Sequence, residues 1–571
     1  MENHRWIIQE KPESFKVQML AQKLNSMPLP LAEILVRRNI ETFDAAKNFF
    51  RPSLEKLHSP FLMKGMEEAV NRILRLEGTK EKVLIYGDYD VDGTTSVALV
   101  CSFFRHLDIQ FDYYIPDRYS EGYGVSQKGV EYAFDNGYSL IIALDCGIKA
   151  HEKVDWANSK NIDFIICDHH TPAETLPNAL AVLDPKRQDC LYPFKELSGC
   201  GIGFKLCQAI AKKKELPPAL VYELLDLTAI SIACDIVPMV GENRILAFHG
   251  LQLIQESPRS GIKTLFPDDF NNEITISDLV FIVGPRINAA GRIKHGKHAV
   301  ALLLASEEEA DDLGVGLEEH NTNRKALDKD ITAEALSMIA DDESLKEAKS
   351  TVVFSEHWHK GVVGIVASRL TETYYRPTVV LTEHDGQVGG SVRSVKGFDV
   401  YQALLKCQDH LIQFGGHKYA AGLTIEKSKI NAFRNKFEEA VRELILPEQL
   451  IPCIEIDAEM KLGEITPKFY RLLQQMAPFG PGNKKPVFIS KAVMNAGYSK
   501  LVGTDKKHLK LMVQQGDHKL EGIGFNQAEW FDQWCEGLPF DLVYTIEENT
   551  WRGVFKLQLN VKAMRLSKDA Q

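Results

Sequence analysis

Four short apolar runs, each ending in an acidic residue, constrain the fold of this chain more than any other feature. They read KVLIYGD, LIIALDCG, DFIICDHH and ALAVLDP, and they occupy residues 82–88, 140–147, 163–170 and 179–185. Stretches with helical spacing of apolar residues, such as SQKGVEYAFDNG, separate them. Buried strands that alternate with helices indicate a parallel α/β sheet, and ligands bind such sheets beyond the carboxyl ends of the strands. We therefore expect the acids to gather at one edge of the sheet.

The patterns before and after these runs predict a chain of several parts. Helical spacing dominates the start, and a heavily charged helical stretch, predicted to be a solvated connecting helix, follows the first α/β unit. A second, smaller α/β unit then carries two glycine-rich loops, VGGSVRS and FGGHKYAAG, and short alternating runs near the end predict a small β-barrel or sandwich. The predicted parts are a helical segment 1–78, an α/β domain 79–296, a connecting helix 297–347, a second α/β domain 348–450 and a β domain 451–571.

Composition places few further limits on function. A chain of 571 residues exceeds one hydrophobic core, so several domains are expected. The formal net charge of -11 argues mildly against a nucleic-acid partner, although a local basic groove can coexist with an acidic remainder. The ten cysteines form no C-x-x-C pair, and neither a signal peptide nor an apolar run long enough to span a membrane stands out. A reducing cytoplasm is the expected location.

The densest acidic cluster, YGDYDVDGTTS at residues 86–96, indicates a bound cation, because like charges this close repel one another. A calcium loop is rejected, since Leu99 stands where that loop needs a bidentate glutamate. The alternative is a two-metal site assembled from several strand ends, with Mn²⁺ favoured over Mg²⁺ by imidazole. A single acid at a strand end is often only a helix cap, but three such ends are hard to explain as caps. The candidate residues are Asp88, Asp90, Asp92, Asp145, Asp168, His169, His170 and Asp235.

These same motifs resemble those of a known family. GDYDVDGTTS, LDCG, CDHH and ACDIVP are similar to successive motifs of the DHH phosphoesterases, and GGSVRS and GGHKYAAG are similar to motifs of the associated C-terminal domain. PDRYSEGYG, GPRINAAGR and MAPFGPGN narrow the resemblance to the RecJ-type exonucleases, whose β domain is an OB-fold. The resemblance covers nearly the whole chain in the right order.

The resemblance implies roles for the candidate residues. Two Mn²⁺ or Mg²⁺ ions are expected, with Asp90, Asp92, Asp145, His169 and Asp235 as ligands and Asp88 as a substitute where related pyrophosphatases carry a histidine. His170 is expected to contact the scissile phosphate or to orient a ligand, and Asp168 to orient the histidines.

Further residues are predicted to bind the substrate, each with a simpler alternative. Arg393 and Ser391 follow two glycines and could hold a phosphate, or belong to a hairpin turn with a surface arginine. His417 could stack on a base or cap a turn, and the tyrosines of PDRYSEGYG could stack as well. The sequence GNKK at 482–485 could line the OB groove or be a solvated turn. The predicted binding residues are Arg118, Tyr123, Arg286, Arg292, Ser391, Arg393 and His417.

The expected function is that of a metal-dependent 5′→3′ exonuclease of single-stranded DNA in recombination and repair. Two rivals remain at this point: a DHH hydrolase of short oligonucleotides or cyclic dinucleotides, and a strand-binding scaffold without catalysis. A monomer is expected, with single-stranded DNA as partner, a helicase and a single-strand-binding protein as further candidates, and no membrane.

Overall fold

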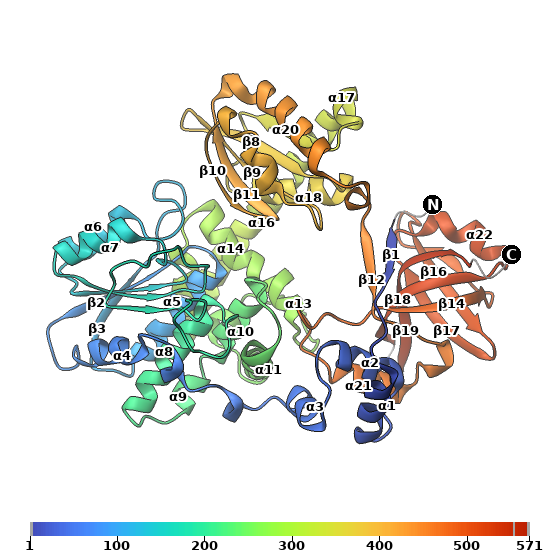
Figure 1. The fold of residues 1–571 in the computed structure, drawn as a ribbon, viewed down its shortest axis with the longest axis horizontal. Coiled ribbons are helices and arrows are strands. Elements are labelled where there is room, and N and C mark those ends of the chain that lie inside the picture. Colours follow the sequence, from blue (N-terminus) through green and yellow to red (C-terminus); the bar gives the residue numbers. More distant parts are fainter. Residues whose placement is uncertain (1–3, 552–553, 568–571) are drawn as a thin grey trace.

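The structure is a computed structural model that describes residues 4–551 and 554–567, and it consists of three lobes (Figure 1). The first α/β domain, drawn in blue to green, carries the acidic runs. The second α/β domain, in yellow and orange, lies above it in this view, and a β-barrel in red lies to the side. Alternating α/β order followed by a barrel confirms the predicted fold class.

The first α/β domain contains a five-stranded parallel sheet in the order β3-β2-β4-β5-β6. The chain order reverses between β2 and β4, so their carboxyl ends flank a topological switch point, the place where open α/β sheets bind ligands. The strands are β2 (Lys82–Gly87), β3 (Gln110–Tyr114), β4 (Leu140–Leu144), β5 (Asp163–Cys167) and β6 (Ala181–Leu183).

Helices cover both faces of this sheet, and they differ in how deeply they are buried. All residues of α5 (Val91–Phe104) are buried, because it lies between the sheet and a further layer that includes α8 and α10. From Val97 to Phe104 its residues are accordingly apolar on all sides except at Ser102. The other helices are α4 (Met66–Leu74), α6 (Gln127–Asp135), α7 (His151–Ser159), α8 (Gly199–Lys213), α9 (Ala219–Tyr222), α10 (Leu225–Cys234), α11 (Gly241–Glu256), α12 (Ser260–Lys263), α13 (Ile276–Asp278), α14 (Gly284–Ile293) and α15 (Lys297–Leu303).

The predicted connecting helix forms as α16 (Glu307–Asp341), but it is not solvated on all sides. One stripe of residues with helical spacing is buried: Leu317 joins the core of the first domain, while Ile331, Ala335 and Ile339 join a core of the second. The buried Asp328 on this stripe pairs with Arg369 at 2.7 Å. The helix therefore fixes the two α/β domains to each other. Its high overall charge led to the prediction of a solvated helix, because the buried stripe is narrow.

The second α/β domain is built on a mixed sheet in the order β10-β11-β9-β8-β7. The two glycine-rich stretches were predicted to be loops, and this prediction is wrong: they form strands. Val388 and Val392 of β9 and Leu423 of β11 face the core, so one face of these two strands is still buried. Strand β10 has no fully buried residue and is held by its pairing with β11. The elements are α17 (Glu343–Lys346), β7 (Thr351–Ser355), α18 (Val363–Tyr374), β8 (Thr378–His384), β9 (Gln387–Arg393), α19 (Val400–Leu405), β10 (Leu411–His417), β11 (Ala420–Ile425) and α20 (Ile430–Leu444).

The C-terminal part forms a barrel, because β14 pairs with β16 and so closes the ring β14-β18-β19-β17-β16. Closure removes the exposed strand edges of an open sheet. The elements are β12 (Cys453–Ile456), β13 (Ala458–Glu459), α21 (Pro467–Gln474), β14 (Phe488–Asn495), β15 (Lys500–Val502), β16 (His508–Gln515), β17 (His518–Gly524), α22 (Phe531–Cys535), β18 (Phe540–Trp551) and β19 (Val554–Leu566).

The N-terminal segment packs mainly against this barrel, far from its neighbours in sequence. Strand β1 (Arg5–Ile8) pairs in parallel with β12, and apolar residues of α1 (Ser14–Lys23) and α2 (Leu29–Arg37) share a core with the barrel. After α3 (Phe43–Phe50) the chain crosses to the first domain, where α4 packs. The segment 1–78 is thus divided between two lobes.

Candidate active site

The predicted acids lie where the sheet topology requires. Asp88, Asp145, Asp168 and Asp184 each stand one residue beyond the end of a parallel strand, and Asp235 follows the last residue of helix α10. Asp145 adopts a left-handed backbone with φ of 59°, which aspartate tolerates better than most residues. Gly199 makes this geometry possible, because a Cβ there would lie 2.6 Å from the Cβ of Asp145.

Four of the predicted site residues meet around Nε2 of His169, and we call them the metal cluster: Asp92, Asp145, His169 and Asp235. The Nε2 atom of His169 lies 3.2 Å from Oδ1 of Asp145, 3.5 Å from Oδ2 of Asp235 and 3.7 Å from Oδ2 of Asp92. Within the described residues, the buried Oδ1 of Asp145 and both ring nitrogens of His169 have no hydrogen-bond partner. Nε2 of His169 and Oδ1 of Asp145 face each other without a hydrogen-bond partner, and such nitrogen and oxygen donors suit a divalent cation.

The electrostatics of the metal cluster also favour a bound cation. Burial, followed by the charges of Asp92, Asp90 and Asp235, raises the pKa of Asp145 well above its ordinary value. Burial and the neighbouring Asp92 raise the pKa of Asp235 to about 8. Burial lowers the pKa of His169, which favours the neutral imidazole that metals bind. The residues present therefore fit a bound Mn²⁺ or Mg²⁺.

Asp92 is held rigidly by groups from two helices. Its carboxylate accepts hydrogen bonds from the backbone N–H groups of Gly199 and Cys200, at 2.7 and 2.8 Å, and from the hydroxyl of Ser231 at 2.7 Å. The two amides belong to the first turn of α8, where unpaired N–H groups favour a carboxylate. The stretch SGCGIGFK at 198–205 opens α8, with Ser198 as its N-cap, and the helix N-terminus orients Asp92.

Asp88 and Asp90 lie beside the metal cluster and make other contacts. Asp88 accepts hydrogen bonds from the N–H groups of Tyr89 and Gly124, and the second of these ties down the loop 116–124. Asp90 caps α5 by accepting from the N–H of Gly93. Among the described residues, neither belongs to a group whose ligand atoms lie within 4.8 Å of one another. Their role as ligands stays a prediction.

A second chain of contacts runs from Asp168 through His170 to Tyr123. Nδ1 of His170 lies 2.7 Å from Oδ1 of Asp168, and its Nε2 lies 3.2 Å from the hydroxyl of Tyr123. Burial lowers the pKa of His170, but the hydrogen bond to Asp168 outweighs it and the net pKa is about 9. His170 is therefore an imidazolium at neutral pH and carries a positive charge next to the metal cluster.

A groove of about 890 Å³ separates the first α/β domain from the second. We call it the interdomain groove. Six of the seven predicted binding residues line it, together with Asp90: Arg118, Tyr123 and Arg292 from the first domain, and Ser391, Arg393 and His417 from the second. The seventh, Arg286, does not reach it, because it forms an ion pair at 2.6 Å with Glu318 of α16 and lines a different cavity.

Three guanidinium groups make the groove basic. Within the described residues, Arg118, Arg292 and Arg393 form no ion pair; Arg118 lies 5.0 Å above the ring of Tyr89, and Arg292 donates to the carbonyl of Gly361. Burial and the charge of Arg118 lower the pKa of Arg292 to about 10. Cations without an acidic partner favour an anion, and guanidinium is suited to phosphate.

The floor of the groove on the second domain is almost bare backbone. Gly415, Gly422 and Ser391 lie side by side across β10, β11 and β9, and added Cβ atoms at the two glycines would meet nothing closer than 3.8 Å. Flat backbone of this kind lets a planar or phosphate group approach closely.

Sequence reasoning did not name several residues that line the groove or support the cluster: Tyr89, Lys360, Gln413, Thr424, Ser198, Ser231 and Asp184. Only Asp184 carried a signal, because it ends the fourth apolar run.

The fold and the site together define a protein of the DHH class. The model of the DHH family, N-terminal domain, matches residues 82–232, and the DHHA1 domain model matches residues 348–443. The RecJ OB domain model matches residues 456–563. The chain belongs to the RecJ family, since it is 36% identical over 572 residues to the single-stranded-DNA-specific exonuclease RecJ of Bacillus subtilis (strain 168), with 99% of this chain and 71% of that protein covered.

Other relatives agree with this assignment. RecJ of Escherichia coli (strain K12), a single-stranded-DNA-specific exonuclease, is 34% identical over 525 residues, which cover 87% of this chain and 89% of the relative. The crystal structure of RecJ in complex with Mn²⁺ from Thermus thermophilus superposes with a TM-score of 0.85 at 25% identity, and covers 99% of this chain and 80% of that chain. The Mg²⁺ complex from the same organism gives a TM-score of 0.79.

No helix in the described part of this chain is long and apolar enough to cross a membrane.

Proposed function

We propose that this protein is a divalent-metal-dependent exonuclease that degrades single-stranded DNA from the 5′ end and acts in recombination and repair. The observation that carries the proposal is that three arginines without an ion pair among the described residues line the interdomain groove together with Asp90, whose charge acts on Asp145 of the metal cluster. The named activity of the RecJ relatives supports the substrate class. The solved relatives that hold Mn²⁺ or Mg²⁺ support the choice of ion.

In the proposed mechanism the metal cluster, together with Asp88 and Asp90, holds two ions. Bound ions of this kind activate a water molecule and neutralise charge on the phosphate. Ser391, Arg393 and Arg118 hold the terminal 5′ phosphate, and Arg292 supports them. The His170 imidazolium donates a hydrogen bond to a phosphate oxygen, and Asp168 keeps it protonated and oriented. Tyr123 and His417 stack on or flank the terminal nucleotide.

The rivals are less well supported. A hydrolase of short oligonucleotides needs no barrel, whereas a RecJ OB domain occupies residues 456–563 of this chain. A scaffold without catalysis has no use for the buried, unpartnered atoms of Asp145 and His169, which destabilise the fold in the absence of a cation. A monomeric state, a cytoplasmic location, and helicase or single-strand-binding-protein partners stay predictions.

The direct test uses one single strand labelled at its 5′ end and the same strand labelled at its 3′ end, each incubated with Mn²⁺. The 5′ label is expected to appear at once as a mononucleotide, while the 3′ label stays on a ladder of shortening strands. A blunt duplex of the same sequence is the control and is expected to persist. Early release of the 3′ label instead would contradict the proposed direction.

A further inference from the structure

The backbone turn that follows Asp235 is strained. Ile236 has a φ of 60°, a left-handed conformation that branched side chains rarely adopt, and its side chain is 66% exposed. An exposed side chain gains little from packing, so nothing at Ile236 itself compensates the strain. Such a conformation persists only where the surrounding structure holds it. The contacts that hold this turn therefore bear on the position of Asp235, one residue before it.

Those contacts come from both lobes. Within the first domain, Val237 and Met239 pack in the core and Asn243 donates a hydrogen bond to the carbonyl of Pro238. The barrel lobe adds contacts at the end of the turn. The backbone N–H of Met239 donates a hydrogen bond of 2.6 Å to the carbonyl of Pro481. The approach is close: a Cβ at Gly480 would lie 3.2 Å from the Cβ of Met239, and one at Gly482 would lie 3.1 Å from Val240. The segment 476–483, which we call the docking loop, thus lies directly against the end of the turn. It belongs to the stretch MAPFGPGN, whose last residues were expected to line a nucleic-acid groove or to be a solvated turn.

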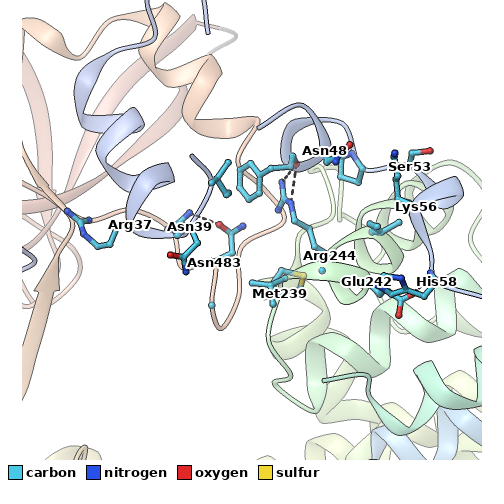
Figure 2. Close-up of a pocket in the computed structure, with 18 residues that line it drawn as sticks. Arg37, Asn39, Asn48, Ser53, Lys56, His58, Met239, Glu242, Arg244 and Asn483 are labelled. Carbon is cyan, nitrogen blue, oxygen red and sulfur yellow. Dashed lines mark hydrogen bonds between the residues drawn. The ribbon is translucent and has the colours of Figure 1, made fainter. Parts of the chain in front are cut away.

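Two polar side chains give the docking loop its shape (Figure 2). Asn483, only 1% exposed, donates to the carbonyls of Met476 and Pro478 at 2.9 and 2.8 Å. From the other side, Arg244 of helix α11 donates to the carbonyls of Met476, Ala477 and Pro478 and also to that of Phe49. The loop is therefore a fixed surface, and a cavity of about 640 Å³ lies beside it.

The other members of the metal cluster are held from within the first domain. Asp92 accepts three hydrogen bonds there, and Asp145 is packed against Gly199. Asp235 differs from Asp92, because no described residue donates a hydrogen bond to its side chain. It differs from the buried Asp145 in being partly exposed, and its backbone N–H is bonded to the end of α10. On the other side its position depends on the strained turn.

We infer that the docking loop of the barrel lobe is a positioning element for the metal site, which holds the turn 236–240 and thereby fixes Asp235. The inference rests on the proposed function, because it assigns Asp235 to the metal. It gives the barrel lobe a role in metal binding in addition to any contact with the strand. Asn483 is a positioning residue in this scheme and touches neither metal nor substrate.

The test compares Asn483→Ala with Asn495→Ala in the full chain. Asn495 also shapes a loop of the barrel, through hydrogen bonds with Gly497, Ser499 and Trp534, but it lies away from the docking loop in sequence and contacts. Mn²⁺ affinity is measured by isothermal titration calorimetry, after circular dichroism has shown that each variant is folded. We expect Asn483→Ala to weaken Mn²⁺ binding about 10-fold, the usual effect of removing a support of a ligand, and Asn495→Ala to leave it unchanged.

Turnover supplies a second readout. Saturating Mn²⁺ is expected to restore the cleavage rate of Asn483→Ala, because the variant misplaces a ligand without removing it. If Asn483→Ala fails to fold, Gly480→Ala tests the positioning role instead, since its new Cβ displaces Met239. We expect Gly480→Ala to weaken Mn²⁺ binding less than Asn483→Ala. Gly522→Ala is its control, because that Cβ meets only ordinary contacts at 3.5 Å.

The outcomes separate the two claims. Unchanged Mn²⁺ affinity in the folded Asn483→Ala and Gly480→Ala chains, beside a wild-type chain that binds Mn²⁺, overturns the positioning role alone. A wild-type chain that binds no Mn²⁺ overturns the proposed function and the inference with it.

Discussion

Asp168 and His170, two residues apart in the chain, form a hydrogen-bonded pair in which Oδ1 of Asp168 lies 2.7 Å from Nδ1 of His170. The backbone N–H groups of Ile148, His169 and His170 also donate to Asp168, so its carboxylate is fully engaged and buried. Burial raises the pKa of Asp168, yet the hydrogen bonds and the charge of His170 outweigh it and the net pKa is lowered. The two residues therefore form an ion pair at neutral pH, in which the imidazolium of His170 lies beside the metal cluster.

His170→Ala is expected to lower turnover of single-stranded DNA about 100-fold, because one preorganised donor to the reacting phosphate is lost. Mn²⁺ affinity should change little, since His169, the proposed ligand, remains. The matched control is His106→Ala, an exposed histidine that pairs with Glu223 on the surface. Steady-state rates together with calorimetric Mn²⁺ titration check the prediction, and near-native turnover would contradict the role of His170.

Asp168→Asn is expected to lower the pKa of His170 from about 9 towards its ordinary value, because the largest favourable interaction of the imidazolium is removed. The measurement is an NMR titration of the histidine ring in the chain kept metal-free with chelator. In the wild-type chain this raised pKa stabilises the fold fully below the ordinary histidine pKa, and the contribution is lost as pH rises through about 9. A His170 pKa that does not move would show that Asp168 is not its main partner.

Metal binding should reverse a pH-dependent loss of stability. Burial, then Asp90, raises the pKa of Asp88 to about 8, and burial, then Asp92, raises that of Asp235 to about 8. The folded chain thus binds more protons than the unfolded chain between the ordinary aspartate pKa and about 8, so the metal-free fold loses stability as pH rises through that window. Thermal unfolding with chelator should show a falling Tm across this range. Mn²⁺ should raise the Tm, and the increase should grow with pH; an increase independent of pH would count against proton displacement.

Arg393→Ala is expected to weaken binding of a strand with a 5′ phosphate, while Arg393→Lys should restore only part of it, because lysine lacks the two-pronged donor geometry. A charged hydrogen bond of this kind contributes about 1.5–3 kcal/mol, so the loss in affinity should be about 10- to 100-fold. Arg286→Ala is the matched control, since that arginine pairs with Glu318 outside the groove. Fluorescence anisotropy with phosphorylated and unphosphorylated strands measures both, and equal losses for Arg393 and Arg286 would contradict the assignment.

Truncation after Ile451 is expected to yield an aggregating chain and not a clean catalytic core. The barrel covers apolar residues of α1 and α2, among them Leu20, Leu31 and Leu35, and its removal would expose them. A chain of residues 53–451, which lacks these helices as well, should be more soluble than residues 1–451. Size-exclusion chromatography compares the two, and a monodisperse 1–451 chain would show that the N-terminal helices do not depend on the barrel.

The local sequence determined most of the catalytic edge of the sheet. Buried strands are strongly apolar and parallel strands end together, so the runs that close with Asp88, Asp145 and Asp168 had to bring those acids to one edge. Helix α5 and the strand-rich tail follow from the same patterns. The glycine-rich strands β9, β10 and β11 could not be recognised, because glycine gives no propensity for a strand. Their stability comes from pairing with each other and from the buried faces of β9 and β11.

Only the tertiary structure decided which residues meet. Arg286 and Arg292 are six positions apart on α14 and lie on different faces of that helix. Arg286 pairs with Glu318, whereas Arg292 lines the groove, and the motif that contains both does not predict this difference. The partners of α1 and α2 lie more than four hundred residues away, in the barrel, and the docking loop meets the turn after Asp235 in the same way. Contacts of this kind depend on how whole lobes pack. The free energy that stabilises them is a sum over many residues of both packed surfaces, so no short stretch of sequence predicts them.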